Sequence, residues 1–240
     1  MINIFAPTGK LRAAINLGNP ILVNRDAVGQ PVGVSIDLAH AFAKRLGLTE
    51  SQVELVVFDG AAKSVECVTQ GQADVGFFAV DPLRGAGISF TAPYVLIEGS
   101  YLVRESSALR SNDQVDTAGI GIAVGQGSAY DLFLSRELKH AHTVRGDGAP
   151  GAMTAFQNNP VEVLAGIKQM LAAEARATPG LRLLPGRFMV IQQAMGCPKA
   201  LGEAAAAYLS QFVETMKANG FLADALRRHG IQGASVPPSA

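Results

Sequence analysis

The sequence has no tryptophan, only two cysteines and no excess of charge of either sign. Its 240 residues include 20 Lys plus Arg and 20 Asp plus Glu, without a local run of like charge. A nucleic-acid-binding protein needs a basic field that replaces phosphate counterions, so this balance argues against that class. No apolar run approaches the roughly 20 residues that a membrane-spanning helix needs. Hydrophobic residues make up 48% of the chain, which excludes a disordered protein and predicts a globular one with a sizeable core.

The small numbers of aromatic, Cys and His residues limit the kinds of ligand and metal site that the chain could form. With no Trp and four Tyr, the chain offers little for stacking against sugar rings. Cys67 and Cys197 are far apart without metal-ligating neighbours, so we expect two buried thiols rather than a disulfide. The four His residues form no metal-ligand pattern, and no cofactor is expected. Residues 1–8 lack the apolar core of a secretion signal, which leaves a cytoplasmic protein and a trimmed, exported form both open.

Strand-like and helix-like segments alternate in the first hundred residues. Apolar, β-branched segments predict strands at residues 11–15, 53–58 and 74–80. Between them, Ser35 is predicted to cap a helix that ends at Gly47, and Asp59 a helix that reaches Gln70. Strands and helices in this order predict a parallel sheet with helices packed outside it.

The alternation restarts in the second half of the chain. An extended crossing segment is expected at residues 100–104, followed by a strand at 120–124 and a helix at 128–140. Further strands are predicted at residues 143–145, 161–165 and 189–194, and further helices at 149–157, 170–176, 200–216 and 221–228. Without an internal repeat or a linker, the predicted architecture is two α/β units joined by extended crossings.

Several short motifs follow one another in the order typical of a single family. They are GVSIDLA at residues 33–39, FTAPY at 90–94, GIAVGQGS at 121–128 and NGFL at 219–222. They are similar to GxxVDLA, FSDPY, GVQxGS and DGTY of the extracellular solute-binding proteins of family 3, which the chain therefore resembles. This family is the amino-acid type of periplasmic binding protein that serves ABC transporters. Each motif is weak alone, and their ordered recurrence over almost the whole chain carries the resemblance.

The resemblance implies a two-lobed, type II periplasmic-binding-protein-like α/β fold, each lobe a mainly parallel sheet flanked by helices. Residues 1–101 with 195–240 would form lobe 1 and residues 102–194 lobe 2, with two hinge crossings between them. Ligand would bind in the cleft between the lobes and close it. The implied function is the capture of a small carboxylate-bearing ligand, an amino acid or a related organic acid, for ABC-type uptake. The implied protein is a periplasmic monomer with an ABC permease as its partner.

Arg84 is the first candidate ligand-binding residue. It ends the DPLR segment at residues 81–84, which is similar to the family's TPER, whose Arg pairs with a ligand carboxylate. A planar guanidinium can hold a carboxylate through charged hydrogen bonds of about 1.5–3 kcal/mol each. The alternative is an ordinary surface Arg.

The second candidate is the turn at Gly127 and Ser128, where a predicted strand passes into a helix. Backbone N–H groups at that helix start, with the Ser128 hydroxyl, would make a second anchor for an anion. A plain helix cap is the alternative, and both readings can hold together. A dinucleotide-binding fingerprint is rejected, because the glycine spacing at residues 119–125 is wrong for it.

The resemblance places five further residues at the ligand: Phe58, Asn16, Asn19, Ala79 and Asp81. Phe58 would line the lobe 1 side of the cleft, with core packing as the alternative. Asn16 and Asn19 stand where amino-acid binders commonly carry an Asp and an aromatic residue, and Ala79 replaces a hydroxyl residue. The resemblance thus implies a site whose neutral side chains differ from those of most amino-acid binders.

Ile167 departs furthest from the family pattern. It stands where the resemblance implies an Asp that holds the ligand's α-ammonium. An unpaired ammonium in a dry cleft would be costly, so a carboxylate compound fits at least as well as an ordinary amino acid. Asp81 could replace the missing negative charge or cap its own turn.

Two other function classes stay open from the sequence. Cyclohexadienyl dehydratases are enzymes on this fold, and such chemistry would need a general acid, for which Glu162 and Asp81 are the candidates. No nucleophile elbow, phosphate loop or Ser/His/Asp set is visible, which favours binding over catalysis. A stand-alone ligand sensor is the other alternative.

Overall fold

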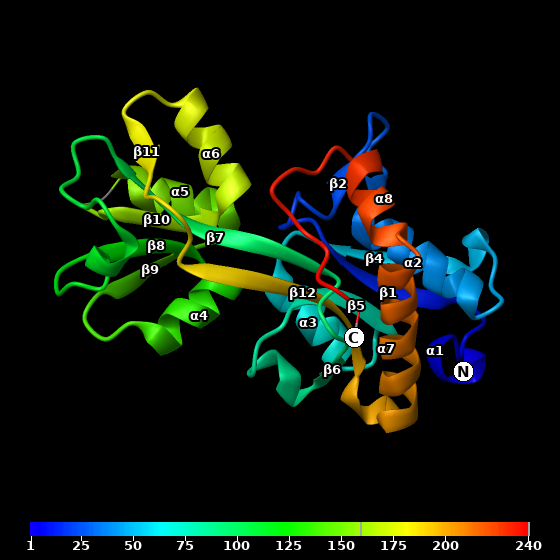
Figure 1. Cartoon of the computed structure of the whole chain (residues 1–240). Coiled ribbons are helices and arrows are strands. Elements are labelled where there is room, and N and C mark those ends of the chain that lie inside the picture. Colours follow the sequence, from blue (N-terminus) through cyan, green and yellow to red (C-terminus); the bar gives the residue numbers. More distant parts are fainter. Residues whose placement is uncertain (159, 240) are drawn as a thin grey trace. The chain divides into compact units, whose positions relative to one another are not determined.

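The computed structural model describes residues 1–158 and 160–239. Within it the chain forms two compact units: unit 1 comprises Met1–Leu96 and Gln192–Ala240, and unit 2 comprises Ile97–Ile191. The chain passes between them within β7 (Val95–Arg104) and β12 (Met189–Pro198), which are drawn as continuous strands in Figure 1. Both units are mixed α/β, as the alternating segments predict.

The sheet of unit 1 has a parallel centre. β1 (Leu11–Asn16) pairs in parallel with β4 (Val53–Phe58) on one side and with β5 (Val75–Ala79) on the other. All five residues of β5 are buried, as its unbroken apolar sequence predicts. β12 joins β5 and the short β6 (Ile88–Phe90) in antiparallel pairing. The carboxyl ends of the three parallel strands therefore share one sheet edge, where loops of α/β proteins commonly carry ligand sites.

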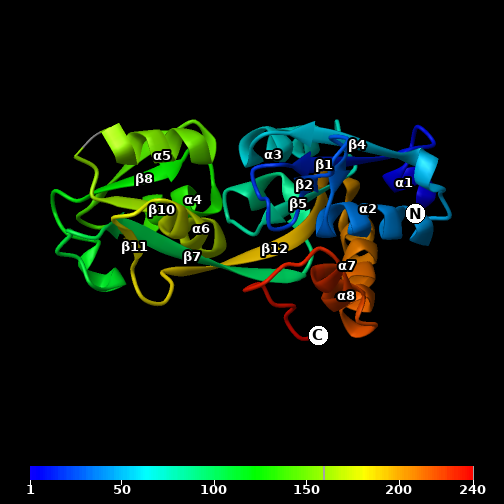
Figure 2. The same ribbon diagram turned by 90° about the horizontal axis from the view of Figure 1, so that it is seen from above.

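Helices cover this sheet by aromatic and aliphatic contacts. The helices of unit 1 are α1 (Ile2–Phe5), α2 (Val34–Arg45), α3 (Ala61–Thr69), α7 (Glu203–Ala218) and α8 (Phe221–Arg228). Phe42 of α2 packs its ring edge-on against Phe5 and also contacts Phe212 of α7. Cys67 and Val68 of α3 pack into a separate buried cluster with residues of β1 and β5. Figure 2 shows α3 lying along the strands of this unit.

The predicted helix caps of unit 1 are wrong at both positions. The N-cap of α2 is Gly33 and that of α3 is Gly60, rather than Ser35 and Asp59. Ser35 lies inside α2 with its hydroxyl 3.3 Å from that of buried Tyr94. Gly33 has a φ of 135°, and a Cβ there would stand 2.3 Å from the carbonyl oxygen of Leu22. Close approach of two backbones therefore decides where α2 begins, and a side-chain cap does not.

Unit 2 is a three-layer sandwich whose strand residues alternate between two cores. β10 (Val163–Ile167) pairs antiparallel with β7 and in parallel with β8 (Gly121–Gly125), which pairs in parallel with β9 (His142–Gly146). Ile122 and Val124 face the cluster that contains Leu134 of α4 (Ala129–Glu137), whereas Ala123 faces the cluster of α5 (Gly148–Asn158) and α6 (Lys168–Ala177). Figure 1 shows α4 on one face of this sheet and α5 and α6 on the other.

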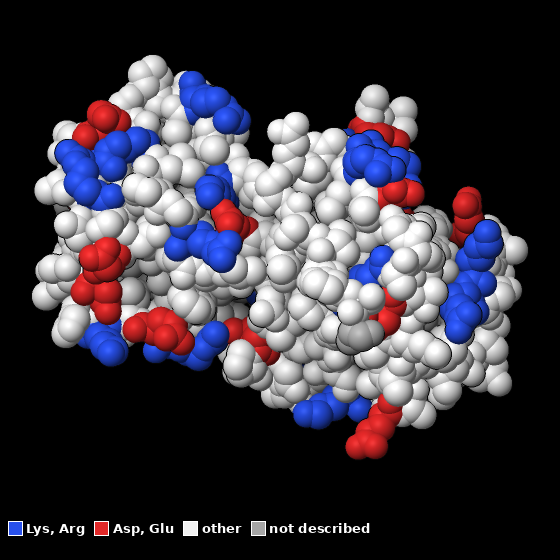
Figure 3. Space-filling model, in the orientation of Figure 1, with Lys and Arg blue, Asp and Glu red and all other residues white. Residues whose placement is uncertain are grey.

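The remaining elements are short. They are the hairpin of β2 (Asn24–Arg25) and β3 (Pro31–Val32), strand β11 (Leu181–Leu183) and the 3-10 turns η1 (Glu50–Gln52), η2 (Arg84–Ala86), η3 (Asn112–Gln114) and η4 (Lys199–Leu201). Among the described residues, no helix combines the length and the apolar character that a bilayer crossing requires. On the face drawn in Figure 3, basic and acidic side chains are interspersed within each unit rather than gathered by sign.

Candidate functional site

Arg84 lies in the turn that follows β5, at the carboxyl edge of the unit 1 sheet. Its side chain is only 6% exposed, and its Nη1 donates to the carbonyl oxygen of Ala79 over 3.0 Å. Burial lowers the pKa of the Arg84 guanidinium, and the attraction of Asp81 opposes that shift. Arg84 is thus a desolvated cation, which interacts more strongly with an anion than a cation in water does.

Asp81 occupies the same turn and is also buried, at 4% exposure. Its Oδ1 accepts the backbone N–H of Leu83 over 2.9 Å, so it caps its own turn. Between and beside the two charged side chains, Val80 and Leu83 are 41% and 70% exposed. The turn therefore combines a buried pair of opposite charges with exposed apolar side chains.

Asn16 and Phe58 end two neighbouring strands and are register partners. The Oδ1 of Asn16 accepts the N–H of Gly18 over 2.9 Å, which holds the amide within its own loop. Phe58 is half-buried and packs against the α3 cluster that includes Phe78, so core packing accounts for much of its surface. Its place at the sheet edge is also compatible with lining a ligand.

Asn19 follows in the loop after β1. Its Oδ1 is buried and has no hydrogen-bond partner among the described residues. A buried acceptor without a donor is costly, and a ligand N–H or O–H would satisfy it. The unit 1 candidates therefore gather at one sheet edge, each in a loop or strand end after β1, β4 or β5: Asn16, Asn19, Phe58, Ala79, Asp81 and Arg84.

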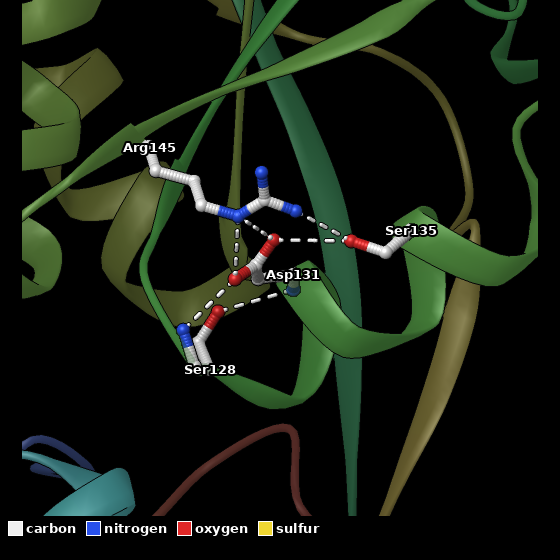
Figure 4. Close-up of polar contacts among 5 residues, drawn as sticks. Ser128, Asp131, Ser135 and Arg145 are labelled. Atoms are coloured by element: carbon white, nitrogen blue, oxygen red, sulfur yellow. Dashed lines mark hydrogen bonds and ion pairs between the residues drawn. The ribbon is translucent and has the colours of Figure 1, made fainter.

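The candidate turn of unit 2 precedes α4 and is drawn in Figure 4. Ser128 is the N-cap, and its Oγ accepts the N–H of Asp131 over 3.1 Å. Gly127 has a φ of 69°, which suits glycine, and its N–H donates to Oδ2 of Asp131 over 2.8 Å. The N–H that would serve as an anion donor thus already has an intramolecular acceptor.

Asp131 is the centre of this network, and sequence reasoning missed it. Its side chain is 5% exposed, and the carboxylate lies 3.0 Å and 3.2 Å from Nε of Arg145 on β9 and accepts the hydroxyl of Ser135. Nη2 of Arg145 donates to Ser135 over 2.8 Å, which fixes the guanidinium beside the carboxylate (Figure 4). The spacing of Ser128 and Asp131 is that of a capping box, a signal present in the sequence.

Ile167 is the last residue of β10 and is buried. Close to it in the chain, Lys168 donates to Glu98 over 2.6 Å, and Arg187 donates to the same carboxylate over 2.7 Å. These hydrogen bonds lower the pKa of Glu98. The other acid considered from the sequence, Glu162, accepts the hydroxyl of Ser107.

A metal centre has no support in the described part of the chain. Among residues 1–158 and 160–239, no group of three or more His, Cys, Asp or Glu side chains could hold a metal ion.

Solved structures of low sequence identity share this fold. The solute receptor for L-cysteine of Neisseria gonorrhoeae aligns with a TM-score of 0.78 and 22% identity over 93% of this chain and 90% of its own. A putative ABC-transporter binding component from Wolinella succinogenes, complexed with lysine, aligns with a TM-score of 0.74 and 18% identity over 92% and 95%. An ancestral amino acid-binding protein, a precursor of cyclohexadienyl dehydratase, gives 0.76 and 20% over 96% and 99%. They confirm the predicted fold class.

Comparison of the sequence with family models identifies the family. No curated protein matches the chain. The family model of bacterial extracellular solute-binding proteins, family 3, matches residues 11–231, which is most of the chain and includes both units. The match confirms the resemblance seen in the ordered motifs, and the chain belongs to the bacterial extracellular solute-binding proteins of family 3.

Proposed function

We propose that this protein captures a small carboxylate-bearing solute, with Arg84 as the carboxylate anchor. The observation that carries the proposal is the burial of this guanidinium at the carboxyl edge of the unit 1 sheet, in a chain of a solute-binding family. A desolvated guanidinium favours a carboxylate that can form two parallel hydrogen bonds with it. Asp81 keeps the turn in place by accepting the N–H of Leu83.

The ligand is an amino acid or a related organic acid. Relatives of the same fold bind lysine and L-cysteine, and these ligands carry an α-carboxylate. In this chain the orphaned Oδ1 of Asn19 supports a ligand that also has an N–H or O–H donor. Asn16, Ala79 and Phe58 would line the same edge of the unit 1 sheet. Ile167 in unit 2 offers no carboxylate for an α-ammonium.

Ser128 is the candidate ligand-binding residue of unit 2. Its oxygen accepts the N–H of Asp131. We propose binding rather than catalysis, because the two candidate general acids are engaged within the chain, Asp81 by Leu83 and Glu162 by Ser107. Delivery of the solute to an ABC permease, by a monomer in the periplasm, is the role that membership of the family supports.

A ligand screen tests the proposal. Unfolding is followed thermally with single amino acids, keto acids and other monocarboxylates, and with prephenate as a check for turnover. A ligand at 100 times its dissociation constant should stabilise the protein by about 2.7 kcal/mol. Arg84→Gln should abolish that shift, whereas Arg25→Gln, which alters an exposed Arg of the same unit bound to the carbonyl of Gly29, should preserve it. An unchanged shift in Arg84→Gln would refute the anchor, and product from prephenate would overturn the choice of binding over catalysis.

A further inference from the structure

The segment that follows α8 runs back to β7 and bonds to it. Residues 231–239 form this segment, which we call the strap, and it is drawn in red in Figures 1 and 2. The N–H of Leu96 donates to the carbonyl oxygen of Ser235 over 2.8 Å, and the N–H of Ser235 donates to the carbonyl oxygen of Leu96 over 3.1 Å. The two residues thus form an isolated antiparallel bridge. This pair of bonds fixes the peptide groups on both sides of Leu96.

Leu96 is the last residue of unit 1 before the chain passes into unit 2. The chain just before it is held firmly, because Tyr94 is fully buried and its N–H donates to the carbonyl oxygen of Gln193 over 2.7 Å. The strap extends this hold to the boundary residue itself. While the strap is attached, any bending of β7 where it leaves unit 1 must therefore begin beyond Leu96.

The second passage between the units is held in a different way. On β12 the boundary residue of unit 1 is Gln192, whose carbonyl oxygen accepts the N–H of Val80 over 2.8 Å, directly after the buried strand β5. The next residue, Gln193, is a register partner of Ala79. This hold belongs to the sheet of unit 1, so its release would disrupt the sheet.

The strap is attached more lightly than a strand of the sheet. Gly233 and Ser235 are exposed, and Val236 and Pro237 are half-buried. Gly233 has a φ of 70°, which suits glycine and turns the chain just before the bridge. Segments with few buried contacts and exposed backbone hydrogen bonds open at a low free energy, separately from the rest of the fold. The strap can therefore detach while the sheet of unit 1 stays folded.

We propose that the strap is a detachable restraint on the passage between the units through β7. Attached, it limits the bending of β7 at Leu96. Detached, it frees the backbone of Leu96 and widens the range of orientations that the units can adopt. The proposal goes beyond solute capture, because it concerns the motion of the chain and needs no ligand. It also gives the two passages unequal roles, since the hold on β7 can be released and the hold on β12 belongs to the sheet.

Ser235→Pro tests the restraint, because proline lacks the N–H that donates to Leu96. Ser235→Ala is the matched control, which keeps both backbone hydrogen bonds of the bridge. Hydrogen exchange at the Leu96 amide should be at least about tenfold faster in Ser235→Pro than in the parent protein or in Ser235→Ala. The amides of β5 should exchange at the parent rate in both variants. Unchanged exchange at Leu96 in Ser235→Pro would overturn the proposal.

The range of motion is measured with one spin label in each unit. Lys63→Cys in α3 and Glu137→Cys in α4 place exposed thiols on helices, whereas the native Cys67 and Cys197 are buried. The distribution of distances between the labels should be broader when Ser235→Pro is added than when Ser235→Ala is added. Distributions of equal width in the two proteins would overturn the restraint on motion.

Gly233→Val detaches the strap in a second way and covers the case in which Ser235→Pro does not fold. A β-branched residue is disfavoured at a φ of 70°, so the turn should open although the N–H of Ser235 is intact. Gly9→Val is the control, because Gly9 has a φ of 79° and open space around it but lies outside the strap. Gly233→Val should reproduce the faster exchange and the broader distances, and Gly9→Val should reproduce neither. Parent-like results for Gly233→Val, or the same changes in Gly9→Val, would refute the role of the strap.

Discussion

The two candidate turns bury different parts of their charge pairs. In unit 1 the buried cation Arg84 lies in the same turn as Asp81, and both side chains are under a tenth exposed. In unit 2 the buried member is Asp131, at 3% exposure, and its cation Arg145 is 44% exposed. A buried charge depends on its partners far more than an exposed one does. Unit 1 therefore buries both members of its charge pair, whereas unit 2 buries the carboxylate and leaves the guanidinium partly in solvent.

This difference in burial affects how each turn would interact with an added anion. The turn of unit 1 keeps a guanidinium whose pKa burial lowers, so an incoming carboxylate would add to its stabilisation. In unit 2 the N–H of Gly127 is already donated to Asp131, which also receives Ser135 and Arg145. An added anion would therefore meet a buried cation in the first turn and a carboxylate in the second.

The largest expected effect comes from leaving Asp81 without its cation. Arg84→Met keeps an apolar side chain of comparable reach, and removal of one member of a buried pair costs about 3–5 kcal/mol. The double variant Arg84→Met/Asp81→Asn should recover at least half of that loss, because the stranded charge is gone. Urea unfolding of Arg84→Met, Asp81→Asn and the double variant gives the coupling free energy between the two side chains. If the losses of the two single variants simply add in the double variant, Arg84 and Asp81 do not stabilise each other, and the comparison with unit 2 fails.

The second effect is an asymmetry within unit 2. Asp131→Ala leaves Gly127, Ser135 and Arg145 without their common acceptor, and we expect a loss of about 2–3 kcal/mol. Arg145→Ala leaves the buried carboxylate of Asp131 without its cation, and we expect a larger loss, of about 3–4 kcal/mol, because only Gly127 and Ser135 still donate to it. Urea unfolding measures both. Equal losses would mean that burial of the carboxylate does not set the cost, contrary to the comparison.

The regular elements of both units were predictable because their patterns are local. The strand over residues 53–58 and the helix over residues 221–228 have the predicted bounds, since alternating or continuous apolar residues and flanking glycines mark them. The short strands β2, β3, β6 and β11 have two or three residues each and carry no such pattern. Their pairing depends on where a partner strand lies.

The sites were predictable only in part for the same reason. Arg84 and Ser128 stand in motifs that resemble a family, and the sequence spacing of Ser128 and Asp131 is that of a capping box. Arg145 is different, because it reaches Asp131 only through the parallel pairing of β8 with β9. The Gly33 cap also depends on a tertiary contact, the approach of the Leu22 carbonyl. Sequence patterns therefore identify the polar and charged groups of a site better than they predict which of these groups come into contact.

The smallest expected effect is an acid sensitivity at Asp116 in unit 2. The backbone N–H groups of Ala141, His140 and Lys139 donate to Asp116 and lower its pKa from 3.8 to about 2. A depressed pKa contributes stability that is present above the unfolded value of 3.8 and is lost as pH falls through about 2. Asp116→Asn lacks this titration, so its unfolding free energy should fall below that of the parent at pH 6 and converge with it as the pH drops below about 4. Urea unfolding across this range measures the gap, and faster amide exchange at Lys139, His140 and Ala141 would locate the loss in unit 2. A gap that stays constant down to pH 2 would show that these donors do not favour the charged form of Asp116.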